Sequence, residues 1–390
     1  MDLKPVGVES QPVPWNKRRS LVCLVVLVTV PAAAQQIDFP EDEAKFLEDE
    51  VELLESLDDE NKNEIVVAPI PIINPTFGTG LALGGMYLYQ LDEESQPSFT
   101  AAGAAYTDSE SYAFAIGQAA YFNDDAWKIK AGAGVFDLNL RFYGVGRLLG
   151  DRGISIPINQ EGWAAGVRGL RRIKGDWYVG AQYWFVRITS TFDTRSPEIE
   201  LPPAVQLDSQ VAGLGVMIEY DSRDNRFNPS GGTLFNATWS NSEEAIGSDF
   251  DFSSSKADYN FYHQLKPGKV IAGRATLCMT PGDAPFYALC KFGQGVDLRA
   301  YVGGRFRDET MATLQVEYRW RLAKKWGAVA FAGAGEVAQT WSDYSLDDLL
   351  PSAGVGLRFK ISDTTGLNLS VDYAVGDDSD AWYFYVGESF

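Results

Sequence analysis

The sequence predicts an all-β protein, a transmembrane antiparallel β-barrel of about 16 strands. One stretch shows the pattern most clearly. From position 313 to 322 polar and apolar residues alternate strictly, so that Gln315, Glu317 and Arg319 point to one face and Leu314 to the other. A soluble sheet with an apolar core alternates in the same way. The composition and the connections must therefore decide between the two.

The composition favours the membrane barrel. The 390 residues include 38 glycines, 13% aromatic residues and a single histidine, which suits many strands with tight turns and aromatic girdles. No long apolar run follows residue 34, so we expect no transmembrane helix in the mature chain. The net charge of −20 argues against a nucleic-acid partner.

Residues 1–34 have the parts of an export signal. Residues 17–19 supply the positive charges, residues 21–30 the apolar core and residues 32–34 a small-residue cleavage site. The apolar core is too short to span a bilayer, which makes an uncleaved anchor the weaker alternative. Cleavage leaves two cysteines, Cys278 and Cys290, and in an exported chain we expect them to form a disulfide rather than to bind metal.

Residues 35–64 form a separate acidic segment. It carries 13 acidic and two basic side chains, a net charge of −11. Two interpretations stay open, a short amphipathic helix and a flexible acidic tether. The helix is indicated by apolar residues near helical spacing, namely Phe46, Leu47, Val51, Leu54 and Leu57.

Residues 65–390 form the predicted barrel. Alternation predicts strands at 65–74, 78–91, 97–108, 111–123, 126–143, 161–173, 176–192, 207–221, 232–242, 248–264, 269–279, 310–322, 326–338, 350–362, 365–375 and 380–390. Pro69 and Pro71 interrupt the first of these. The last runs to the carboxyl terminus, and we expect it to close the barrel against the first strand.

The connections separate the barrel from a soluble sandwich. Those after even-numbered strands are mostly short, as at 123–125, 174–175 and 363–364, whereas several after odd-numbered strands are long and polar, as at 144–160 and 280–309. Outer-membrane barrels have short periplasmic turns, long extracellular loops and both termini in the periplasm. A soluble β-sandwich gives no reason for short and long connections to alternate along the chain.

Four motifs give the barrel a resemblance to the BamA/TamA-type outer-membrane assembly and translocation barrels, also called the bacterial surface antigen family. The first motif resembles the family's DxRDN…PxxG turn, and the second, at 282–286, precedes a long loop. The third motif resembles the family's (V/L)RG(F/Y) loop tip. The fourth resembles the family's terminal assembly signal. The first motif comprises Asp221, Arg223, Asp224, Asn225, Pro229 and Gly232; the third Leu298, Arg299, Ala300 and Tyr301; the fourth Phe384, Val386, Gly387 and Phe390.

The resemblance implies a bacterial outer-membrane protein that assists the insertion or translocation of other proteins, with the loop 280–309 plugging the lumen. The expected partners are outer-membrane lipid and lipopolysaccharide, client outer-membrane proteins, and a periplasmic partner at residues 35–64. Family members receive clients through POTRA domains, and residues 35–64 are too few to form one. This segment would then act as a docking peptide, or fold into the lumen against Arg168, Arg319 and Arg321.

The loop-tip motif implies a specific ion pair. A guanidinium buried in the lumen needs a carboxylate, so we expect Arg299 to pair with Glu317, beside Arg319 on the inward face of its strand. The alternative is that these are ordinary wet lumen residues.

Two departures from the family pattern concern this pair. Ala300 replaces the family glycine, and the stretch 331–335 lacks the aspartate of the family's FxDxG strand. Two alternatives follow: the contact that pins the loop is weaker, or another acid takes that role, Glu219 or Asp372.

Two other functions compete with protein insertion. One is a plugged or gated pore, or a structural surface barrel. The other is an outer-membrane enzyme, which the sequence disfavours: His263 is the single histidine, and no GxSxG, paired metal-ligand or phosphate-binding motif is present. We expect no catalytic residue, cofactor or metal.

Overall fold

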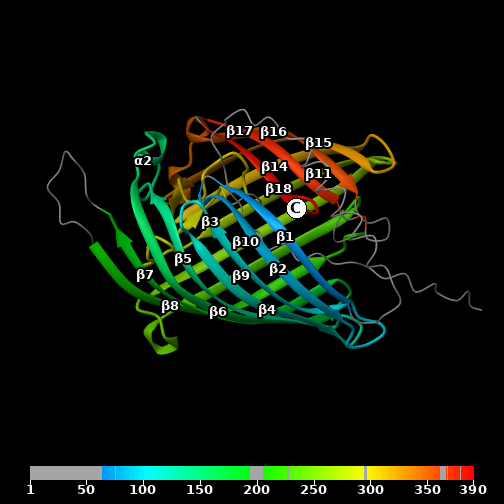
Figure 1. Ribbon diagram of the computed structural model, residues 1–390, viewed down its shortest axis with the longest axis horizontal. Coiled ribbons are helices and arrows are strands. Elements are labelled where there is room, and N and C mark those ends of the chain that lie inside the picture. Colours follow the sequence, from blue (N-terminus) through cyan, green and yellow to red (C-terminus); the bar gives the residue numbers. More distant parts are fainter. Residues whose placement is uncertain are drawn as a thin grey trace, which may run out of the picture.

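The protein is an all-β barrel. The computed structural model describes residues 64–74, 76–193, 205–225, 228–293, 297–360, 366, 368–377 and 379–390. The predicted export signal and residues 35–63 of the acidic segment lie outside these ranges. Sixteen antiparallel strands form one sheet that curls into a nearly closed barrel (Figure 1). The predicted fold class is therefore confirmed.

The barrel strands follow each other in chain order. They are β1 (Glu64–Asn74), β2 (Gly78–Tyr89), β3 (Ser98–Thr107), β4 (Tyr112–Phe122), β5 (Trp127–Phe142), β6 (Ile156–Lys174), β7 (Trp177–Phe192), β8 (Val205–Asp221), β9 (Gly232–Ser242), β10 (Phe252–Lys266), β11 (Lys269–Met279), β14 (Thr310–Arg321), β15 (Trp326–Ala338), β16 (Leu350–Lys360), β17 (Asn368–Gly376) and β18 (Ser379–Val386).

Short elements occupy the connections. They are the helix α2 (Leu148–Asp151), the 3-10 helices η1 (Glu244–Ile246), η2 (Trp341–Asp343) and η3 (Leu346–Asp348), and a two-stranded sheet of β12 (Cys290–Lys291) and β13 (Arg307–Asp308). In the described ranges no helix is long and apolar enough to cross a membrane.

The two faces of the sheet are separated as the alternation predicts. On β14, Leu314 and Val316 are 56% and 43% exposed and face outward, whereas Gln315 and Glu317 are buried on the inner face. The outward face carries similar large apolar side chains on most other strands, which suits contact with lipid. The inner face surrounds the lumen.

Connections at the two ends of the barrel differ in length. At one end, which we call the turn end, tight connections such as 175–176, 267–268 and 322–325 join the strands. At the opposite end, the loop end, the connections include 143–155, 243–251, 280–309 and 339–349. The predicted order of short and long connections is thus present, and β1 begins at the same end of the barrel where β18 finishes.

Three predicted strand boundaries were wrong by four residues or more. The sixth strand starts at Ile156 rather than 161, and the tenth at Phe252 rather than 248. The last strand stops at Val386 and does not reach residue 390. Gly387 causes this stop, because its φ of 100° lies in the left-handed region and turns the chain away from the sheet.

At the seam of the barrel, the described residues form no ladder of backbone hydrogen bonds. β1 and β18 lie side by side (Figure 1). Within the described residues, however, the ladders run from β1 to β18 in chain order and none joins β18 back to β1. The last strand therefore lies against the first, as expected, but without a described ladder between the two strands.

The outward position of β14 side chains predicts a depth-dependent effect of charge. Leu314→Arg places a cation against the middle of the bilayer and should lower the free energy of unfolding by about 2–4 kcal/mol. Leu322→Arg, on the same face at the strand end, should lower it by about 1 kcal/mol or less. Urea unfolding in lipid bilayers measures both, and equal effects would show that this face does not contact the bilayer core.

Candidate functional site

The loop 280–309, which we call the lumenal loop, is fastened to the barrel at its base. A disulfide joins Cys278 at the end of β11 to Cys290 on β12, as the sequence predicts. The pairing of β12 with β13 brings Lys291 opposite Arg307. Burial and the nearby Arg307 charge lower the pKa of Lys291 to about 7, and its ammonium group donates a hydrogen bond to the Tyr287 carbonyl at 2.7 Å.

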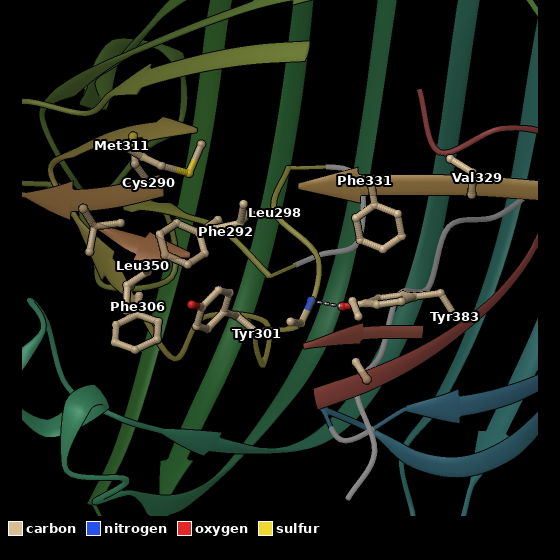
Figure 2. Close-up of a cluster of buried hydrophobic side chains, with 14 residues drawn as sticks. Cys290, Phe292, Leu298, Tyr301, Phe306, Met311, Val329, Phe331, Leu350 and Tyr383 are labelled. Carbon is tan, nitrogen blue, oxygen red and sulfur yellow. Dashed lines mark hydrogen bonds between the residues drawn. The ribbon is translucent and has the colours of Figure 1, made fainter. Parts of the chain in front are cut away.

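An aromatic core holds the tip of the lumenal loop inside the barrel (Figure 2). The rings of Tyr301, Phe292 and Phe306 pack against one another, with centroids 5.5 to 5.7 Å apart. The Tyr301 hydroxyl donates to the Pro351 carbonyl on β16 at 2.5 Å. From the barrel wall, the Tyr383 hydroxyl accepts a hydrogen bond from the backbone N–H of Ala300 at 2.8 Å. The loop tip is thus bound by wall residues from two strands.

Ala300 occupies a position that favours glycine. Its φ is 90°, in the left-handed region, where an L side chain is strained. The side chain is fully buried. An alanine at this position is therefore strained relative to a glycine, and the surrounding contacts must offset that strain.

Arg299 lies at the centre of the site. Its side chain is 1% exposed, and its two terminal nitrogens contact Glu317 at 2.5 Å and Asp372 at 2.6 Å. The guanidinium carbon also lies 3.4 Å from the ring centroid of Phe331. Since both carboxylates are fully buried, these are not wet lumen residues. The expected Arg299–Glu317 contact is present.

Asp372, two further arginines and one further glutamate extend the Arg299–Glu317 pair into a closed ring of six charged side chains, which we call the charge ring. The ring holds three positive and three negative charges. Its contacts are Arg299–Glu317 (2.5 Å), Glu317–Arg319 (2.7 Å), Arg319–Glu388 (3.8 Å), Glu388–Arg358 (2.8 Å), Arg358–Asp372 (2.5 Å) and Asp372–Arg299 (2.6 Å).

The charge ring also captures the end of the chain. After Gly387 the chain turns inward, so that Glu388 joins the ring and the carbonyl of Phe390 accepts a hydrogen bond from Arg319 at 2.8 Å. The Phe390 ring packs 5.4 Å from the Arg319 guanidinium. Among the other terminal-motif residues, Phe384 faces outward from β18, the strand that Val386 ends.

Asp372, one of the two candidates, is the second carboxylate that contacts Arg299. At Gly333, where the family pattern has its aspartate, a Cβ would lie 2.5 Å from the Leu314 carbonyl oxygen, 2.7 Å from the Gln315 side chain and 3.1 Å from a methyl group of Leu298. This position is therefore crowded by β14 as well as by the loop, and the carboxylate comes from β17 instead. The other candidate, Glu219, lies elsewhere on the inner wall and pairs with Lys128 at 2.5 Å.

The remaining motif forms a compact turn between β8 and β9, distant from the loop in sequence. Arg223 contacts Asp221 at 2.8 Å, and the side chains of Asp224 and Asn225 accept hydrogen bonds from backbone N–H groups at 2.9 Å. Its other two residues are Pro229, which is buried, and Gly232, whose φ is 98°. These residues shape the turn.

Sequence reasoning missed part of the charge ring. Arg358 follows the inward alternation of β16, and that signal could have identified it. Glu388 gave no such signal, because it was assigned to a strand that the chain leaves. Tyr385, which donates to Asp372 at 2.5 Å, was also missed. No group of three or more His, Cys, Asp or Glu side chains in the described part of the chain is arranged to hold a metal ion.

Comparison with known proteins supports one family. Residues 99–390 match the family model described as the Omp85 superfamily domain. The chain is 29% identical over 159 residues to the outer membrane protein assembly factor BamA of Nitratidesulfovibrio vulgaris. That match covers 36% of this chain and 20% of the relative, so the chain corresponds to about a fifth of its length.

Solved structures have the same fold at low sequence identity. BamA from Haemophilus ducreyi lacking POTRA domains 1–3 is 14% identical, with a TM-score of 0.55 over 84% of this chain and 70% of that chain. CdiB from Escherichia coli is also 14% identical, with a TM-score of 0.56 over 84% of this chain and 62% of that chain.

The charge ring predicts a large effect of removing one charge. Glu317→Gln leaves two buried guanidinium groups without a shared carboxylate and should lower the free energy of unfolding by about 3–5 kcal/mol. Asp124→Asn breaks an exposed pair with Arg172, 3.1 Å apart, and should lower it by less than about 1 kcal/mol. Denaturant titration in detergent compares them, and similar values would contradict a structural role for the ring.

Proposed function

Because this chain belongs to the Omp85 superfamily, we propose that it assists the insertion or translocation of proteins at the outer membrane. The route is the seam between β1 and β18. Strand edges without a partner are templates for another strand, so a client strand can pair with an exposed edge at the seam, where the edge of β18 contains no proline. The observation that carries this proposal is the lack of a described ladder between β1 and β18.

The two prolines of β1 support a weak seam. Pro69 and Pro71 have the same parity, so both of their nitrogens point to the same side of the strand. The ladder from β1 to β2 is continuous through both residues. The missing N–H donors therefore belong to the side that faces β18, where proline is tolerated in sheets. Closure of the seam lacks two hydrogen bonds as a result.

The charge ring supports the same proposal from the other side of the seam. Glu388 and Phe390 are bound inside the lumen. Because these residues do not extend β18, the edge of β18 that could pair with β1 is shorter. We infer that the turn end faces the periplasm, so that clients and a periplasmic partner reach the seam there, and that the loop end faces lipopolysaccharide.

A second candidate is a gated pore, and the buried tip of the lumenal loop is the observation that favours it. In this function the charge ring would hold the plug in place. Arg299→Ala should then raise single-channel conductance severalfold in planar bilayers, while client insertion stays at the level of empty liposomes. In the proposed insertion function, wild-type protein accelerates insertion and the seam variants below change the rate.

Restoring the donors of β1 should strengthen the closed seam. Pro69→Val with Pro71→Val adds two backbone hydrogen bonds, each worth about 0.5–1.5 kcal/mol, and should slow client insertion by about fivefold or more. Insertion is measured by the electrophoretic shift of an unfolded outer-membrane protein added to proteoliposomes.

The matched control is Leu81→Val with Leu83→Val. These residues pair with the two prolines on β2, and their substitution leaves the number of donors unchanged. An unchanged rate in the proline variant would exclude the seam as the route. No acceleration by the wild-type protein over empty liposomes would reject the insertion function itself.

A further inference from the structure

The outward face of the barrel contains a groove between β4 and β7, with a volume of about 740 Å³. Its floor is made by Ala131 and Ala133 on β5 and Ala165 on β6, which the strand register places in two neighbouring rows. On the same two strands Lys128 and Leu170, at positions of the opposite parity, are buried on the inner face. The groove therefore opens toward the lipid and not toward the lumen.

Larger side chains form the two walls of this groove. Ile116 on β4 is exposed at one side. At the other side, Trp163 stacks on Phe185 with ring centroids 4.9 Å apart, and the Tyr183 hydroxyl donates a hydrogen bond to the Ile246 carbonyl at 3.2 Å. Because Ile246 belongs to η1, a segment outside the sheet holds this wall in place.

The lining of the groove suits a hydrocarbon chain better than a peptide. At one margin the Thr100 hydroxyl donates to the side-chain oxygen of Gln118 at 2.6 Å, and the Gln118 amide donates to the Tyr89 hydroxyl. These polar groups use one another as partners, and the other lining residues are Gly, Ala, Val, Ile and aromatic. A peptide backbone placed here would lose its hydrogen bonds to water without replacement, whereas an acyl chain has none to lose.

The charges at the two ends of the groove differ. Toward the turn end, Arg171 is exposed, and its guanidinium carbon lies 5.2 Å from the ring centroid of Trp127. No carboxylate of the described residues forms an ion pair with Arg171. Toward the loop end, Asp137 and Glu161 are directly opposite each other and outnumber Arg187. A phosphate group is therefore attracted to the turn end and repelled from the loop end.

The spacing along β6 matches one lipid molecule. Arg171 and Glu161 are ten positions apart, about 33 Å along the strand and about 25 Å in height at the tilt usual for these barrels, which is the height of the outward apolar band. Val167 and Trp163 in the groove lie about 13 and 26 Å from Arg171 along the strand. A chain that starts at Arg171 would thus reach the groove with its distal part. At Gly169, between them, an added Cβ would meet nothing within 4 Å, so the path is open.

We propose that this groove binds an acyl chain of an anionic glycerophospholipid whose phosphate contacts Arg171, with the Trp127 ring beside the glycerol region. With the turn end in the periplasm, the bound molecule belongs to the periplasmic leaflet. The choice of leaflet rests on the orientation inferred above. The binding itself is independent of the insertion function, because it uses only the outward face of β4 to β7.

Native mass spectrometry tests the headgroup. The protein is released from nanodiscs that contain equal amounts of phosphatidylglycerol and phosphatidylcholine with the same acyl chains. The wild type should retain phosphatidylglycerol with a preference of about fivefold or more. Arg171→Gln should abolish this preference, and Arg187→Gln, at the opposite end of the groove, should leave it unchanged. Equal retention of both lipids by the wild type, or a preference lost in Arg187→Gln and kept in Arg171→Gln, overturns the proposal.

Filling the path tests the acyl chain. Gly169→Trp adds a side chain to open space on the outward face and should lower phosphatidylglycerol retention about fivefold or more. Val355→Trp, which adds bulk to the outward face of β16, should retain as much as the wild type. Heat-modifiable migration reports whether each barrel has folded, and Ala133→Phe on the groove floor replaces Gly169→Trp if that variant does not assemble.

A comparison of chain lengths separates the acyl chain from the headgroup. In detergent, the wild type should bind dihexanoyl phosphatidylglycerol about fivefold or more weakly than dioleoyl phosphatidylglycerol, because the short chains end before Val167. Equal binding of the two lipids, or unchanged retention in the folded groove variants, would show that the groove holds no acyl chain and overturns the proposal.

Discussion

The charge ring around Arg299 connects five parts of the chain. It takes one residue from the lumenal loop, one pair from β14, one residue each from β16 and β17, and one from the terminal tail. Burying a single guanidinium or carboxylate costs several kcal/mol, which one opposite charge offsets only in part. A closed ring with three charges of each sign gives every member two partners, so no charge remains uncompensated.

The charge ring holds the lumenal loop in one position. Arg299 cannot move away alone, because its departure leaves Glu317 and Asp372 sharing the remaining arginines in a buried site. The aromatic packing of Tyr301 and the strained backbone of Ala300 depend on the same placement. The position of the loop and the ionic contacts of the inner wall are therefore coupled.

Most of the fold followed from the sequence because strand alternation is a local property. The inward direction of Glu317 and Arg319 could be predicted from β14 alone, and with the loop motif it gave the Arg299–Glu317 contact. For the second carboxylate the sequence could only offer two candidates, Glu219 and Asp372. Which of them contacts Arg299 depends on which strand faces the loop tip across the lumen. Glu388 was missed because one left-handed residue, Gly387, ends β18, and the alternation of Trp382 to Val386 gives no sign of that turn.

The tail relates the charge ring to the seam. For β18 to continue beyond Val386 and present a longer edge to β1, residues 387–390 would have to leave the lumen. That movement breaks the Arg358–Glu388 ion pair and the hydrogen bond from Arg319 to the Phe390 carbonyl. The two buried guanidinium groups would then lose part of their partners, which costs free energy. The prolines of β1 offer no compensating donors at positions 69 and 71. The same contacts that hold the lumenal loop therefore oppose closure of the seam, so an occupied lumen and a weakly closed barrel are two consequences of one set of ion pairs.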